Sequence, residues 1–244
     1  LRASRTFPFV SKTFRTNFIG LATRAMIGLP VQPAQISLVD LDYVGVKAAQ
    51  FSFTRLQGAD PTLGVEMMST GEVACFGQGV HEAYLRALEA TRFRMPVPGE
   101  AVLVSVGSDG KKKLAESCAQ LVELGYRVLA TEGTHAFLVE QGVDATLVHR
   151  PSAGGEPSAV GELQAGRIGM VINEPNDKDR AGVSDGYLVR RAAVDFGVSL
   201  ITNIKCAVLF CAALHKRATT SRSGAAAAAA AEPKSMDDYY TQDF

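Results

Sequence analysis

Short apolar bursts alternate with amphipathic stretches through the second half of the chain. The bursts fall at 102–106, 127–130, 146–148, 169–172 and 199–202, and helical patterns begin at Lys111, Thr134, Ser158, Ser184 and Ile204. Apolar runs of this length, separated by helical segments, are typical of parallel strands joined by crossover helices. The pattern predicts an α/β fold with a doubly wound five-stranded parallel sheet, covered by helices on both faces.

The first half of the chain mixes helix-like and strand-like segments. Helices are expected over 18–27 and 81–91 and a strand over 43–49, and a Met-Pro-Val-Pro-Gly cluster at 95–99 cannot continue a helix. The end of the chain carries seven alanines that have no apolar face to bury. We therefore expect three regions, namely 1–95, 96–218 and a disordered low-complexity tail over 219–244.

The composition limits the classes of partner that the chain is expected to bind. The chain has 25 basic and 25 acidic residues and zero net charge, so no global field points to nucleic acid. Its apolar runs fall short of the roughly 20 residues that cross a bilayer, so no membrane partner is expected. The four cysteines form no CxxC pair, and neither a disulfide framework nor a metal site is predicted. The start at Leu1 without a methionine suggests a piece of a longer chain.

An anion site is predicted at the end of the first parallel strand. The strand runs into Gly107-Ser-Asp-Gly110 and three lysines at 111–113, at the start of a helix where free N–H groups and the helix dipole favour negative charge. The stretch matches neither GxGxxG nor GxxxxGK[ST], so a nucleotide hydrolase is not supported. A tight turn followed by a solvated lysine run is the alternative interpretation.

Neighbouring strand ends add polar groups. "ATEGT" places Thr131 and Thr134 beside the first site, and further strand ends supply Arg150, Asn173 and Asn176. None of the four histidines is spaced from a nucleophile and a carboxylate in a way that would indicate a catalytic group. The predicted pocket is therefore equipped to bind rather than to react.

Two long blocks carry a family resemblance. "VLVSVGSDGKKKL", "GYRVLATEGTHAFLVEQGV" and "VINEPN" resemble the methylglyoxal-synthase-like domain that ends the large chain of carbamoyl phosphate synthetase. "RASRTFPFVSK" and "FSFTRLQGADPTLGVEMMSTGEVACFG" are similar to the last part of the second ATP-grasp unit of that enzyme. The resemblance implies the C-terminal part of an ATP-dependent ligase that makes carbamoyl phosphate, with the regulatory domain intact and the catalytic unit truncated.

The resemblance also implies roles, cofactors and partners. Arg2 and Arg5 match family arginines that face the phosphorylated intermediate, while the family's metal ligands lie upstream of Leu1. ATP and Mg (or Mn) would serve the full-length enzyme, and we expect this fragment alone to bind neither and to be inactive. A glutaminase subunit or domain is the expected partner, homo-oligomers are possible, and the expected location is cytoplasmic, with mitochondrial or plastid alternatives.

The effector pocket is carried over residue by residue, and the positions that match are Ser105, Lys111, Thr131, Thr134, Arg150, Asn173 and Asn176. The family's effectors are nucleotides, phosphoribosyl pyrophosphate or N-acetylglutamate. Arg150 suits a phosphate, whereas the two asparagines are similar to those of the N-acetylglutamate-responsive form, so the effector stays open. Pyrimidine and arginine pathways both stay open too.

Two other functions compete with this one. A free-standing effector-binding module would need residues 96–218 to fold alone. A methylglyoxal synthase-type lyase would use the carboxylate of Glu156 in "AGGEPS", but "GVSDGY" holds no histidine where that lyase has its acid-base partner.

Overall fold

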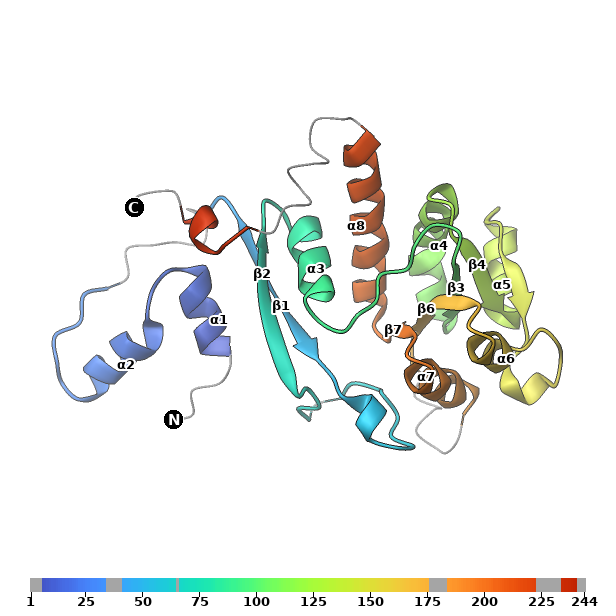
Figure 1. Cartoon of the computed structure of the whole chain (residues 1–244), viewed down its shortest axis with the longest axis horizontal. Helices are drawn as coiled ribbons and strands as arrows, with labels where there is room; N and C mark the ends of the chain where they lie inside the picture. Colours follow the sequence, from blue (N-terminus) through green and yellow to red (C-terminus); the bar gives the residue numbers. More distant parts are fainter. Residues whose placement is uncertain (1–5, 34–40, 65, 176–183, 223–233, 241–244) are drawn as a thin grey trace.

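An antiparallel strand pair organises the N-terminal part of the chain (Figure 1). The computed structural model describes residues 6–33, 41–64, 66–175, 184–222 and 234–240. The N-terminal elements are α1 (Thr6–Thr13), α2 (Phe18–Met26), β1 (Val44–Gln50), η2 (Phe53–Arg55), β2 (Gly71–Gly77) and α3 (Val80–Glu89). Strand β1 pairs with β2 along its whole length, and α3 packs on both strands. The elements expected in this half are present, with small shifts at their ends.

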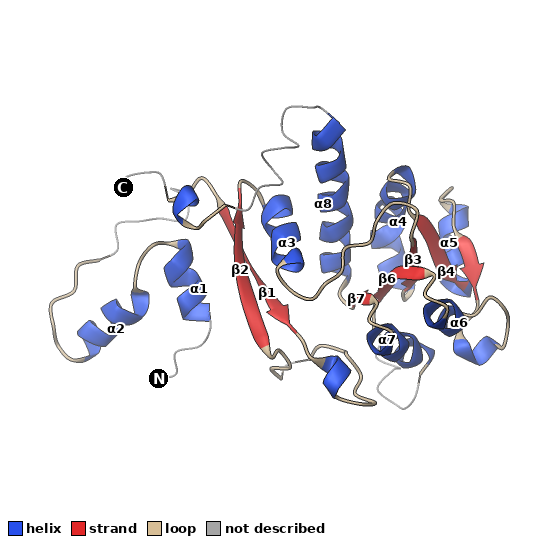
Figure 2. Cartoon of the chain, in the orientation of Figure 1, coloured by secondary structure: helices blue, strands red, loops and turns tan. Residues whose placement is uncertain are grey.

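A parallel sheet forms the centre of the C-terminal part (Figure 2). Its strands are β3 (Ala101–Ser105), β4 (Arg127–Thr131), β5 (Thr146–Val148), β6 (Ile168–Asn173) and β7 (Ser199–Ile201). Their order across the sheet is β5-β4-β3-β6-β7, and every neighbouring pair is parallel. The predicted doubly wound five-stranded sheet is therefore confirmed. Because β3 is central and the chain winds outward on both sides of it, the carboxyl ends of β4, β3 and β6 lie side by side.

Helices cover both faces of this sheet because the strands are apolar on both sides. Val102 and Val104 of β3 pack into one cluster with α4 (Ser108–Glu123), α5 (Glu132–Glu140) and α8 (Ile204–Arg222). Ala101 and Leu103 point to the other face and pack with α6 (Ala159–Gln164) and α7 (Asp185–Asp195). The alternation of side chains along a strand thus gives two separate cores.

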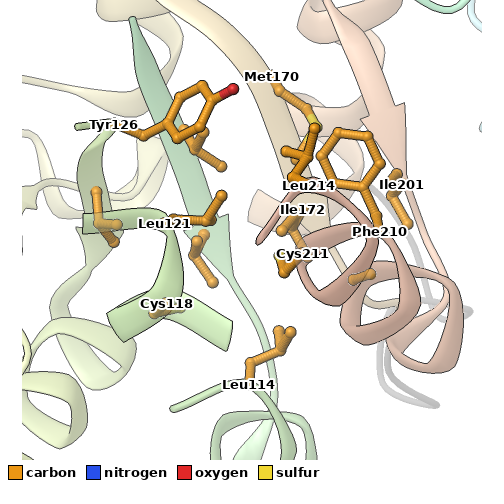
Figure 3. Packing of buried hydrophobic residues seen from close by; sticks show 14 of the residues in the cluster. Leu114, Cys118, Leu121, Tyr126, Met170, Ile172, Ile201, Phe210, Cys211 and Leu214 are labelled. Atoms are coloured by element: carbon orange, nitrogen blue, oxygen red, sulfur yellow. The ribbon is translucent and has the colours of Figure 1, made fainter. Parts of the chain in front are cut away.

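Helix α8 joins the two parts of the chain. It contacts α4 over the parallel sheet and α3 of the N-terminal part. Phe210 is fully buried, and its ring meets Phe93 edge-on at a centroid distance of 5.6 Å. Figure 3 shows Phe210 and Leu214 of α8 meeting Met170 of the sheet in the cluster that also holds Leu114 of α4. The parts are therefore packed through a shared apolar core.

The end of the chain departs from the expected disordered tail. Helix α8 continues to Arg222, beyond the expected boundary at 218, and residues 237–239 form a short 3-10 helix, η5 (Asp237–Tyr239). Tyr239 is buried against Tyr43 and Phe76 of the N-terminal part. The sequence pattern missed this segment because its burial depends on aromatic partners far away in the chain.

Candidate functional site

A cavity of about 390 Å³ opens at the carboxyl ends of β3, β4 and β6. It is lined by Ser105, Val106, Gly107, Lys111, Thr131, Gly133, Thr134, Arg150, Asn173, Glu174, Ser184, Asp185 and Gly186. The fold thus brings together the strand-end residues that the sequence singled out between Ser105 and Asn173. Arg2, Arg5 and Asn176 lie outside the described residues.

Two helix N-termini face this cavity. Helix α4 begins with Gly107 as its N-cap residue and α5 with Thr131, and neither N-cap residue bonds the first N–H groups of its helix through a side chain. Lys111 reaches from the first turn of α4 to α5, since a Cβ placed on Gly133 would lie 3.1 Å from the Lys111 Nζ. Backbone N–H groups, two helix dipoles and an ammonium group therefore favour an anion at this end of the cavity.

The floor of the cavity is a chain of hydrogen bonds between strand ends. The Thr131 hydroxyl donates to Ser105 Oγ at 3.0 Å, and the Asn173 amide donates to the Ser105 carbonyl at 2.9 Å. Thr134 Oγ1 accepts from the Val106 N–H and donates to the Val106 carbonyl, both at 3.3 Å. Thr131, Thr134 and Asn173 are buried. The Thr134 hydroxyl lines the cavity and is bonded to the backbone of Val106, directly after β3.

Arg150 lies at the cavity rim and is held by Glu132, which the sequence analysis did not single out. Glu132 accepts from Arg150 Nε at 3.0 Å and from its backbone N–H at 3.2 Å, and its carboxylate lies 3.3 Å from His149 Nδ1. Burial tends to raise the pKa of Glu132, but hydrogen bonds from its own N–H, from the Arg150 N–H and from His149, together with the charge of Arg150, lower it overall. The carboxylate thus stays ionised and fixes the guanidinium near the anion end.

Two carboxylates, Glu174 and Asp185, also line the cavity. Glu174 lies at the first turn of α4, since a Cβ placed on Gly110 would lie 2.7 Å from Glu174 Oε2. Burial raises the pKa of Glu174. The positive charge of Lys113 acts to lower this pKa, and the negative charge of Asp109 raises it further. Asp185 accepts from the Ser152 N–H at 2.9 Å and from its hydroxyl at 2.6 Å. The cavity therefore presents acidic groups beside its cationic ones, which suits a ligand with both an anionic group and a hydrogen-bond donor.

Glu156, the carboxylate considered for lyase chemistry, does not line this cavity. It is exposed, and it accepts from the N–H of Ser158, two residues along. The described residues contain no cluster of three or more His, Cys, Asp or Glu that could hold a metal ion.

Part of the chain matches a known protein family. The family described as "MGS-like domain" matches residues 113–202, which include most of the parallel sheet and its cavity. The chain therefore carries an MGS-like domain.

Curated relatives extend the match to nearly the whole chain. It is 44% identical over 229 residues to the Multifunctional protein URA2 of Saccharomyces cerevisiae, covering 90% of this chain and 10% of that protein. It is 41% identical over 228 residues to the mitochondrial carbamoyl-phosphate synthase [ammonia] of Rattus norvegicus, covering 90% and 15%. The arginine-specific carbamoyl phosphate synthase large chain of Schizosaccharomyces pombe is 44% identical over 220 residues, covering 89% and 18%.

The chain belongs to the carbamoyl-phosphate synthase large-chain family and corresponds to its C-terminal region. It spans about a tenth to a fifth of the length of the relatives it matches. The match fits neither a free-standing module nor a methylglyoxal synthase, because these relatives are far longer than the chain and two of the three are named as carbamoyl-phosphate synthases. No helix in the described ranges is long and apolar enough to cross a membrane.

Proposed function

We propose that this chain is the C-terminal part of an ATP-dependent carbamoyl-phosphate synthase, and that its cavity binds an anionic effector that regulates the enzyme. The observation that carries the proposal is the convergence of Lys111, Arg150 and the N-termini of α4 and α5 on one cavity. Among the described residues that line the cavity, no nucleophile is paired with a base. Effector binding is therefore the function that its chemistry supports.

The division of labour within the chain follows from this. Residues 1–95 would be the end of the second ATP-grasp unit and residues 96–218 the regulatory domain. Helix α2 buries none of its residues, although its sequence is amphipathic, so the N-terminal part fits a piece of a larger unit. Arg2 and Arg5 are proposed to face the phosphorylated intermediate in the full enzyme, where Arg forks suit phosphoryl charge.

The effector class is proposed from the charges of the cavity. Lys111 and Arg150 suit a phosphate group or carboxylate, and Glu174 and Asp185 suit a hydrogen-bond donor of the same ligand. UTP, phosphoribosyl pyrophosphate and N-acetylglutamate are the compounds to compare. The relatives named as mitochondrial and the one named as a multifunctional protein are 41–44% identical to this chain. These identities do not separate the pyrimidine from the arginine pathway or one compartment from another. A glutaminase partner remains part of the proposal.

The test uses the full-length enzyme with Lys111→Ala. Loss of a charged hydrogen bond is worth about 1.5–3 kcal/mol, so effector affinity should fall roughly tenfold to a hundredfold while turnover without effector stays nearly unchanged. Calorimetry with the three compounds and carbamoyl phosphate formation with and without them give the two readouts.

Lys112→Ala is the matched control, because Lys112 is exposed on the same helix and does not line the cavity. It should leave affinity and turnover as they are. Equal loss of turnover in Lys111→Ala with and without effector would show that the cavity is not regulatory.

A further inference from the structure

Arg190 of α7 is a fully buried charge whose partners come from both parts of the chain. Its side chain is 0% exposed. Nε and NH2 donate to the two carboxylate oxygens of Asp60 at 2.9 and 2.7 Å, and NH1 donates to Asn173 Oδ1 at 2.7 Å. A buried guanidinium is tolerated only where its donors are satisfied and its charge is balanced. Asp60 in the N-terminal part supplies an opposing charge.

On the side of the cavity, Arg190 determines how Asn173 is oriented. A guanidinium can only donate and a carbonyl can only accept, so the Asn173 amide must turn its oxygen to Arg190 and its nitrogen to the Ser105 carbonyl. Ser105 Oγ in turn accepts from Thr131. The hydrogen bonds therefore run without a break from Arg190 to the ends of β6, β3 and β4, which form the cavity floor.

On the other side, α7 holds residues 53–60 of the N-terminal part, here called the 53–60 segment. Besides the Asp60 pair, Tyr187 donates to the Gly58 carbonyl at 2.8 Å. Arg191 donates to the carbonyls of Leu56 and Ala59, both at 3.0 Å. Figure 1 shows this segment running beside α7. The same helix thus contacts the cavity floor and fixes the 53–60 segment.

The charge of Asp60 is held in place by this arrangement. Burial raises its pKa, but the hydrogen bonds from Arg190 and the charge of Arg190 lower it overall. The two-pronged geometry leaves little freedom for either partner to move alone. A shift of the 53–60 segment must therefore move Arg190, and a shift of Arg190 must change the hydrogen bond to Asn173.

We infer that Arg190 is a positioning residue for the cavity, and that Asp60 sets its position, so that the cavity floor and the docking of the 53–60 segment are energetically coupled. This inference rests on the proposed function as far as an effector is concerned. Coupling of this kind is reciprocal: a ligand that holds Asn173 favours the docked segment, and a docked segment favours the ligand.

The experiment is hydrogen–deuterium exchange on the full-length enzyme, comparing wild type with Asp60→Asn and Arg190→Lys. Asparagine keeps the shape of Asp60 without its charge, and lysine keeps the charge without a fork that spans both partners. Without any ligand, both variants should raise deuterium uptake in peptides covering 103–107 and 131–135 at least twofold. Saturating UTP or N-acetylglutamate should protect the 53–60 segment in wild type and fail to protect it in the variants.

Glu162→Gln is the matched control, since Glu162 accepts from Arg167 Nε and NH2 in a similar two-pronged pair and lies in neither the cavity lining nor the 53–60 segment. It should leave uptake at 103–107 and 131–135 at the wild-type value, and peptides from β1 and β2 should exchange alike in every variant that has folded. Wild-type uptake at the cavity floor in both Asp60→Asn and Arg190→Lys would overturn the inference. If wild type binds none of the compounds, the proposed function fails while the ligand-free comparison still decides the coupling.

Discussion

Glu132 organises the rim of the cavity at the scale of single residues. It occupies the first turn of α5, where a negative charge interacts favourably with the helix dipole. From there it holds His149 and both the side chain and the backbone of Arg150. The carboxylate does not need to touch a ligand to matter, because it sets the direction in which the Arg150 guanidinium points.

Replacing Glu132 with Gln should reduce stability in a way that depends on pH. Its folded pKa is lowered, so its stabilising effect is complete above the unfolded pKa of about 4.3 and is lost as the pH falls through the folded pKa. The wild-type advantage in unfolding free energy should be largest near neutral pH and shrink below about pH 4. Denaturant titrations across this range measure it.

Glu140→Gln is the control, because Glu140 is exposed at the other end of the same helix. The difference in unfolding free energy between wild type and Glu140→Gln should change little with pH. A difference between wild type and Glu132→Gln that stays constant down to acid pH would contradict the prediction.

At the scale of elements, the junction of β2 with α3 depends on a close approach of backbones. Strand β2 ends at Gly77 and α3 begins at Val80. A Cβ on Gly77 would lie 2.6 Å from the backbone nitrogen of Ala83, closer than real Cβ contacts allow. The helix can therefore lie this near the strand only if residue 77 has no side chain.

Gly77→Ala should lower the thermal unfolding temperature, because backbone atoms cannot rotate away as a flexible side chain would. Overpacking of this kind costs about 1–3 kcal/mol, which corresponds to a fall of a few degrees in a chain of this size. Gly79→Ala is the control, since a Cβ at Gly79 has nothing within 4 Å. Equal melting temperatures for the two variants would contradict the close approach.

The elements that the sequence predicted well are those that local patterns encode. Each strand of the parallel sheet is an apolar burst, and the cavity residues follow because parallel strands end at one edge. The pairing of Asp60 with Arg190 joins residues 130 positions apart, and no periodicity marks it. Glu132 stood in the "ATEGT" stretch, yet its role depends on Arg150, which only the fold brings near.

At the scale of the whole molecule, the C-terminal segment completes the aromatic cluster of the N-terminal part. Tyr239 donates to the Phe76 carbonyl at 3.2 Å and accepts from Arg86. The Tyr239 ring lies 5.9 Å from that of Tyr43, edge-on. Tyr240 lies beneath the Arg15 guanidinium at 4.6 Å. Residues that follow the parallel-sheet domain in sequence therefore stabilise the part that precedes it.

Tyr239→Ala should release this segment while leaving the parallel sheet intact. The variant loses a buried ring and its hydrogen bonds, so peptides covering 234–240 and β2 should exchange faster, whereas those from β3 and β4 should not change. Hydrogen–deuterium exchange resolves the two regions. Asp237→Ala, at an exposed position of η5, is the control, and faster exchange throughout the parallel sheet in Tyr239→Ala would contradict a local role.

The covalent link between α8 and this C-terminal segment changes what the aromatic contact has to achieve. A short link holds two sites at an effective concentration of about millimolar order, so a contact too weak to hold a free peptide suffices within one chain. The same peptide supplied separately would compete only when its own concentration approached that value. Cutting the chain between Arg222 and Lys234 would accordingly make occupancy of the aromatic cluster depend on protein concentration.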